Sequence, residues 1–139
     1  LETLWVSRLD AKALSICSQL TQLGSLAIYK TPILASLAPL KNLSKLTFLD
    51  LVDDSIQSVD GVERFPCLYF LCLMGNPITD LSPLTFSSDI RSINITFLDI
   101  EDYSFLTQVP SLKSVYCDKE QGEMIRTIPA LDNIELIVG

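Results

Sequence analysis

The side chains best suited to chemistry are four cysteines, because this 139-residue chain contains no histidine. Histidine is the commonest general base and the commonest metal ligand, so its absence argues against most hydrolytic and zinc enzymes. Cys67 and Cys72 are five residues apart, which is not the CxxC spacing of a redox motif. The sequence also lacks a glycine-rich phosphate loop. We therefore predict a protein that is not an enzyme and requires no cofactor.

A candidate metal site is the acidic cluster of Asp50, Asp53 and Asp54. Carboxylates this close in sequence could hold calcium, but they lack the ligand spacing and the glycine turn of a calcium-binding loop. A solvated turn is the simpler interpretation, and we predict no metal site.

The charge balance narrows the choice of partners. The chain has 17 acidic and 10 basic residues, a net charge of -7, and no basic stripe that could neutralise nucleic-acid phosphates or an anionic membrane surface. The most apolar stretch, residues 65–74, is too short to span a membrane. We expect neither nucleic-acid binding nor membrane insertion.

The remaining cysteines, Cys17 and Cys117, fall at inward positions of the repeat described below and are expected to be small core residues. Four unevenly spaced cysteines do not form a disulfide scaffold in a chain of this size, which favours an intracellular over a secreted location. Two glycosylation sequons begin at Asn42 and Asn94 and would matter only in a secreted eukaryotic protein.

Leucine is the most conspicuous component, with 24 residues, and its spacing reveals a repeat. Apolar residues recur at positions one, four and six of units that start near residues 1, 23, 46, 68, 90 and 112, with a partial unit at 134 in which Ile134 and Ile137 hold positions one and four. Position eleven is apolar in Ile33, Ile56, Ile78 and Ile100. The second unit has 23 residues instead of 22, which predicts a one-residue bulge around Leu34–Ser36.

Each unit contains two kinds of periodicity. Positions four to six alternate apolar and polar, as in a strand with one buried face, whereas the later positions step by three, which suits a short helix or 3₁₀ turn. Neither half can bury its apolar face alone, but stacked units can. The prediction is a single-domain α/β solenoid over residues 1–139, with a parallel β-sheet on the concave face and short helical or 3₁₀ segments on the convex face.

The stretch Leu68–Leu84, LYFLCLMGNPITDLSPL, resembles the leucine-rich repeat of the 22-residue class, typified by internalins and the leucine-rich regulatory subunit of protein phosphatase 1. That family usually has asparagine at position nine, where only Asn76 matches here; Asp54 is expected to substitute for it in its own unit. Irregular loops are expected near Leu98 and over Asp118–Gly122. Neither end has a recognisable polar cap, so we expect a longer parent chain, flanking domains or self-association.

Outward positions two, three, five, seven and eight form the concave face, and they hold an unusual number of aromatic residues. An aromatic and methionine cluster with a polar rim is typical of a protein-binding surface. The predicted partner-binding residues are Trp5, Tyr29, Phe48, Asp50, Tyr69, Phe70, Cys72, Met74, Phe97 and Tyr116.

These features favour a non-catalytic module that binds a protein partner. Two alternatives remain open: a structural spacer array in a larger microbial surface or effector protein, as the resemblance to internalins implies, and a regulatory subunit of an enzyme. The repeat by itself does not choose among them, because one fold serves many functions.

Overall fold

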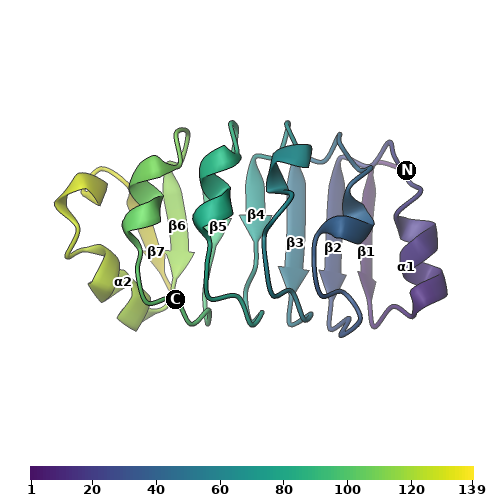
Figure 1. Cartoon of the computed structure of the whole chain (residues 1–139), viewed down its shortest axis with the longest axis horizontal. Helices are drawn as coiled ribbons and strands as arrows, with labels where there is room; N and C mark the ends of the chain where they lie inside the picture. Colours follow the sequence, from purple (N-terminus) through teal and green to yellow (C-terminus); the bar gives the residue numbers. More distant parts are fainter.

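The computed structural model describes all 139 residues and contains one parallel sheet whose seven strands follow each other in sequence order (Figure 1). The strands are β1 (Thr3–Ser7), β2 (Ser25–Tyr29), β3 (Phe48–Val52), β4 (Phe70–Cys72), β5 (Ser92–Asn94), β6 (Ser114–Cys117) and β7 (Glu135–Val138). Each strand therefore pairs only with the strands of the neighbouring units, as the repeat predicts.

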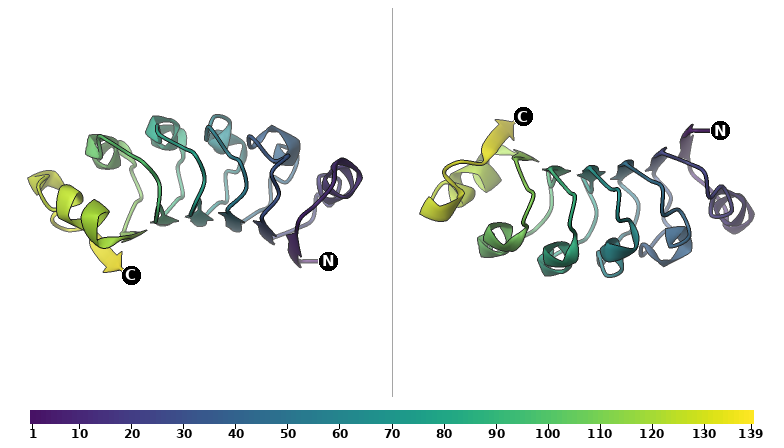
Figure 2. Two further views of the ribbon diagram at one scale, coloured as in Figure 1. Left: turned by 90° about the horizontal axis from the view of Figure 1, so that it is seen from below. Right: turned by 90° about the horizontal axis from the view of Figure 1, so that it is seen from above.

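The segments that connect one strand to the next contain short helices, which lie on the opposite face of the solenoid from the strands. They are α1 (Ala11–Cys17), η1 (Ala38–Leu40), η2 (Val62–Arg64), η3 (Ser82–Phe86), η4 (Ser104–Gln108), α2 (Lys119–Ile125) and η5 (Pro129–Leu131), where η denotes a 3₁₀ helix. Figure 2 shows the molecule as an arc, with the sheet on the inner side and the helices on the outer side. The predicted solenoid is confirmed.

Strand pairing confirms the register of the first six units. Leu49 lies opposite Leu71, and Ser25 lies opposite Phe48, which reproduces the 23-residue second unit. The last unit differs, because Val115 pairs with Leu136 and not with Ile137. The sixth unit returns through α2 and η5 instead of a single 3₁₀ turn, so its length is 21 residues from strand to strand.

A single core of 35 buried residues runs along the solenoid between the sheet and the convex helices. The inward leucines and isoleucines of units two to five are buried, whereas Leu4 and Val6 of β1 are only partly covered because no strand lies on their outer side. Cys17 and Cys117 are buried, as predicted.

The extra residue of unit two does not lie at the predicted position. Ile33 was assigned to inward position eleven, but its side chain is 50% exposed, and Leu34 is fully buried in its place. A turn closed by the Leu34 N–H and the Thr31 carbonyl, 2.9 Å apart, absorbs the additional residue. The insertion therefore lies just before the predicted Leu34–Ser36 segment.

The turns after the strands share one backbone feature. Position eight has a left-handed conformation in the first five units: Arg8, Lys30 and Asp53 at φ 52°, Gly75 at φ 74° and Phe97 at φ 65°. Only glycine adopts this region without a steric penalty, so four of the five turns retain backbone strain.

Polar side chains near position nine satisfy the backbone groups of these turns. The Asn76 amide donates to the Leu51 and Leu73 carbonyls at 2.8 and 2.9 Å, and its oxygen accepts from the Ile56 N–H at 3.1 Å. Asp54 accepts from the Thr31 N–H at 2.8 Å and so occupies the asparagine position, as predicted.

The first and last of these turns use other residue types. The Thr31 hydroxyl accepts from the Leu9 N–H at 3.1 Å. At the far end, Gln121 donates to the Ile95 and Leu98 carbonyls at 2.7 and 3.0 Å. The irregular loop predicted over Asp118–Gly122 is wrong, because Asp118 and Gln121 form a reciprocal capping box that starts α2.

Replacing Gly75 with alanine tests the left-handed turn. A methyl group there would meet the Asp53 carboxylate and would occupy a conformation that L-residues avoid, so Gly75→Ala should lower the free energy of unfolding by about 1–2 kcal/mol. Gly24→Ala is the matched control, because its methyl group would lie 3.8 Å from the Glu2 carbonyl, an ordinary contact. Urea denaturation measures both, and equal losses would contradict the assignment of strain to position eight.

Candidate functional site

Three aromatic rings from different strands meet on the concave face. Phe48 of β3 and Phe70 of β4 lie opposite each other in the sheet, and their rings stack with centroids 4.7 Å apart and planes 7° apart. Tyr116 of β6 contacts Phe70 edge-on at 6.1 Å. The residue facing Phe70 on the intervening strand β5 is Ser92, whose small side chain leaves room for this contact. We call Phe48, Phe70 and Tyr116 the concave aromatic cluster.

A fourth aromatic residue lies beside this cluster, at the start of β4. Tyr69 is 54% exposed, and the Arg91 guanidinium lies 5.8 Å from the centre of its ring, within range of a cation–π interaction. Lys113 holds the next place in the same column, since its N–H donates to the Arg91 carbonyl at 2.8 Å. Tyr69, Arg91 and Lys113 form a partly basic edge to the cluster.

The floor of the concave face next to Phe48 is polar and partly buried. The Tyr29 hydroxyl donates to one Asp50 oxygen at 2.8 Å, while the other Asp50 oxygen is buried without a partner. Burial, followed by the Asp50 carboxylate, raises the pKa of Tyr29 to about 12, so its hydroxyl keeps its proton at neutral pH.

Cys72 belongs to this floor. The register places it on the concave side, but it is only 4% exposed, between Asp50 of β3 and Asn94 of β5. Burial raises the pKa of its thiol to about 12, and the neighbouring Asp50 adds to the rise. Cys72 is thus a protonated, covered side chain, and we do not retain it as a contact residue.

The other predicted site residues are distributed along the face. Trp5 and Phe97 are 72% and 71% exposed, whereas Tyr29 and Met74 are partly buried. Trp5 pairs with Ala27 on β2, so a strand without a large concave side chain at that level separates it from Asp50 and the cluster. Phe97 holds the left-handed position in the turn after β5. Of the predicted aromatic residues, only Phe48, Phe70 and Tyr116 have rings in contact with one another.

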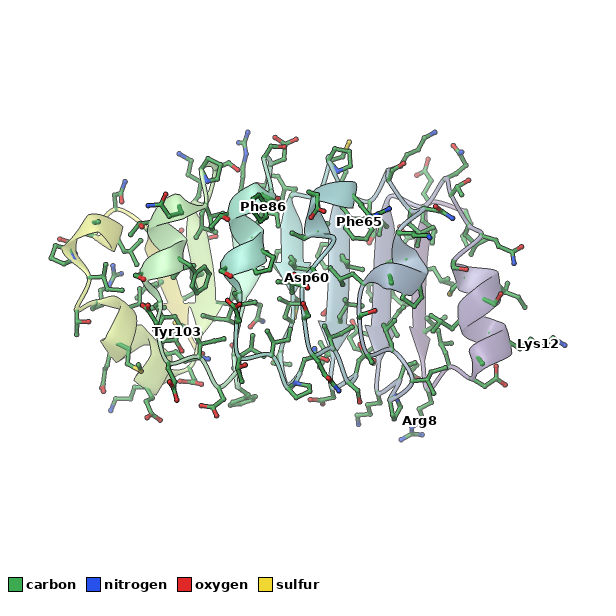
Figure 3. The ribbon with its side chains drawn as sticks, in the orientation of Figure 1. Arg8, Lys12, Asp60, Phe65, Phe86 and Tyr103 are labelled. Carbon is green, nitrogen blue, oxygen red and sulfur yellow. The ribbon has the colours of Figure 1, made fainter.

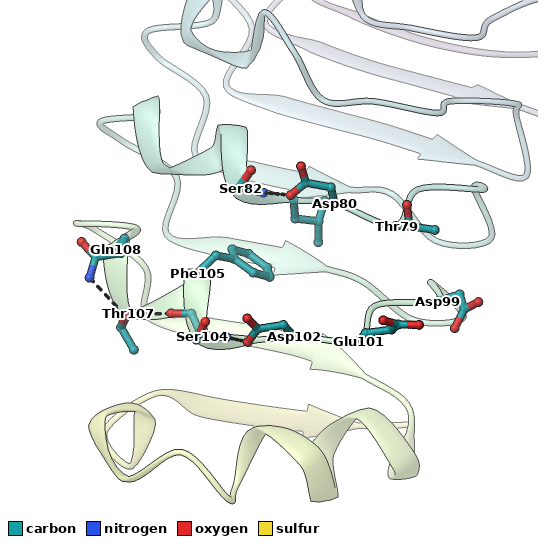
Figure 4. Close-up of a pocket in the computed structure, with 11 residues that line it drawn as sticks. Thr79, Asp80, Ser82, Asp99, Glu101, Asp102, Ser104, Phe105, Thr107 and Gln108 are labelled. Atoms are coloured by element: carbon teal, nitrogen blue, oxygen red, sulfur yellow. Dashed lines mark hydrogen bonds between the residues drawn. The ribbon is translucent and has the colours of Figure 1, made fainter.

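A hollow of about 890 Å³ lies on the convex side of the molecule between η3 and η4 (Figure 4). Its lining includes the carboxylates Asp80, Asp99, Glu101 and Asp102. The Ser82 N–H lowers the pKa of Asp80, and the Ser104 N–H does the same for Asp102, so both remain ionised at neutral pH. The 22-residue recurrence of Asp-x-Ser could have revealed this acidic groove from the sequence.

No group of three or more cysteine, aspartate or glutamate side chains is arranged to hold a metal ion. None of the helices has the length and apolar character needed to cross a bilayer.

Comparison with known proteins identifies the architecture. Internalin C2 from Listeria monocytogenes superposes with a TM-score of 0.74 at 24% sequence identity, covering 100% of this chain and 61% of that one. Internalin F from the same organism gives a TM-score of 0.63 at 22% identity, covering 99% of this chain and 47% of that one. This is a leucine-rich-repeat fold of the internalin type.

This chain spans less than two thirds of the length of either internalin. No family model and no curated protein matches the sequence. The likeness therefore describes the fold, and the function rests on the side chains that the fold displays.

The four thiols should differ sharply in reactivity. Cys67 is exposed, while Cys17, Cys72 and Cys117 are buried, and alkylation requires an accessible thiolate. Brief iodoacetamide treatment of the folded domain at pH 8 should therefore label Cys67 at least about ten-fold faster than the other three. Peptide mass spectrometry measures this, with urea-unfolded protein as the control in which all four react. Rapid labelling of Cys72 in the folded state would show that the concave floor is open.

Proposed function

We propose that this domain is a non-catalytic module that binds a protein partner through the concave aromatic cluster and its edge. The observation that carries the proposal is the meeting of three aromatic rings from β3, β4 and β6 on a sheet face with exposed Tyr69 beside them. Aromatic and arginine side chains that gather on a surface with a polar rim have the composition of a binding hot spot.

The scaffold would favour such binding because little of it needs to be ordered. Phe48 and Phe70 already hold each other in a stacked arrangement, and every strand of the sheet is fixed by its neighbours. A preorganised surface loses little conformational entropy on association, so burial of the rings contributes more fully to affinity.

The charges around the cluster suggest the chemistry of the partner. Arg91 and Lys113 form one edge, and Arg8 and Lys30 are exposed at the ends of the first two strands. A partner that offers an apolar ridge to Phe48 and Phe70 and carboxylates to the basic edge would match both features. Because that edge is exposed, we expect binding to weaken as ionic strength rises.

A double substitution tests the proposal. Phe48→Ala/Phe70→Ala removes the stacked rings while leaving the inward core positions unchanged, so it should reduce capture of the partner at least about ten-fold. The immobilised domain would be exposed to cell extract at two salt concentrations, and captured proteins would be quantified by mass spectrometry. Circular dichroism would establish that the variant remains folded.

Phe86→Ala is the matched control. Phe86 is 73% exposed on η3 of the convex side (Figure 3), so its loss removes an exposed phenylalanine without touching the concave face. A protein lost with the concave variant and retained with Phe86→Ala would be a specific partner. Equal capture by the wild type and both variants would contradict binding through the aromatic cluster, and loss of folding in the double variant would assign the rings to structure.

A further inference from the structure

The turn after β3 contains a buried carboxyl group whose environment resembles that of an amide. Asp54 is 8% exposed, and its Oδ1 accepts from the Thr31 N–H at 2.8 Å. Its other oxygen, Oδ2, is buried and has no hydrogen-bond partner. A charged oxygen in such a place would forfeit its hydration without compensation, which is strongly unfavourable.

The next repeat shows what this position requires. Asn76 is the 22-residue equivalent of Asp54, and its oxygen also accepts a backbone N–H, that of Ile56. Its nitrogen, the counterpart of Asp54 Oδ2, donates to the Leu51 and Leu73 carbonyls. The turn therefore requires an acceptor on one side of the side chain and a donor on the other. An ionised aspartate has only acceptors, whereas a protonated aspartic acid has both.

We propose that Asp54 is protonated in the folded protein and acts as an asparagine analogue, so that the link between the second and third repeats is strengthened in acid and weakened when this carboxyl ionises. The proton on Oδ2 supplies the donor that Nδ2 supplies in Asn76. Raising the pH releases that proton to solvent and leaves a buried charge in the turn.

The electrostatic surroundings of Asp54 also favour the protonated form of its carboxyl group. Burial raises the pKa of Asp54 to about 7, the Thr31 N–H opposes the rise, and the carboxylates of Asp53 and Asp50 add to it. The flanking turns present Thr31 and Asn76, neither of which titrates.

The consequence for stability follows from proton linkage. In the unfolded chain Asp54 titrates near its ordinary value of about 4, so between about pH 4 and pH 7 the folded state binds one more proton than the unfolded state. Stability should fall as the pH rises through this window, and the loss should be complete above the folded-state pKa.

The substitution Asp54→Asn replaces the titrating group with the residue that the turn accommodates without a proton. Wild type should lose thermal stability between about pH 5 and pH 8, whereas D54N should lose much less and should melt about 3–8 °C higher than wild type at pH 8. At pH 5 the two proteins should melt at similar temperatures.

Asp53→Asn is the matched control, because Asp53 is exposed, adjacent in sequence and carries the same charge. Any general relief of repulsion in this acidic chain should also appear in D53N. Because the Asp53 carboxylate raises the pKa of Asp54, D53N should move the pH-dependent loss of stability to slightly lower pH, but only D54N should abolish it. An identical pH profile for D53N and D54N would overturn the proposal.

Carbon NMR of the Asp54 carboxyl in the wild-type protein provides a test that needs no substitution. The proposal expects a titration midpoint above about 6, compared with about 4 for an ordinary aspartate. A midpoint in the ordinary range would overturn it, whether or not D54N folds.

Discussion

The structure depends on the burial of one row of apolar side chains that no single repeat can cover. A unit of about 22 residues offers one short strand and one return turn, and its inward leucines become inaccessible only when another strand lies on each side. The contrast between fully buried Leu26 and Leu49 and the partly covered Leu4 shows this directly. The stability of the stack and the register of its strands follow from that requirement.

Stacking imposes a second demand at the strand ends. The chain reverses there within a few residues, and the backbone groups of each turn become buried between neighbouring units. A left-handed residue makes the reversal, and a polar side chain provides the hydrogen bonds. This chain fulfils that role with Thr31, Asp54, Asn76 and Gln121, so turns of the same geometry differ in chemistry. The uniform core therefore coexists with turns that respond differently to pH and to substitution.

The sequence predicted features that repeat and missed those that occur once. Strand positions, the parallel sheet and the inward leucines follow from a spacing that is repeated six times. Ile33 was misplaced because a local insertion shifts the pattern by one residue, and only packing decides whether Ile33 or Leu34 enters the core. The prediction of a loop over Asp118–Gly122 fails because Asp118 and Gln121, which depart from the asparagine pattern of the repeat, cap the start of a helix.

Prediction of the binding residues is limited by side-chain exposure, which the repeat pattern does not determine. The register correctly assigned side chains to the concave side, but exposure there also depends on the size of neighbouring side chains on other strands. Cys72 is covered although it points to the concave side, and Tyr116 contacts Phe70 diagonally across β5, where Phe70 faces the small side chain of Ser92. The sequence spacing between equivalent residues predicts neither the burial of Cys72 nor the contact of Tyr116, because both depend on side chains from three adjacent strands.

The concave aromatic residues are informative because the fold does not require them. The inward positions must be apolar in every unit, so their leucines report only the architecture. The outward positions carry no such constraint, and units one, two and five each have serine, glycine or threonine at two of them. Stacking of Phe48 on Phe70 contributes to the pairing of β3 and β4, but the buried core does not require aromatic residues at these positions. Part of the apolar surface of Phe48 and Phe70 stays in contact with water in the free domain, which favours a role in contacts with another molecule.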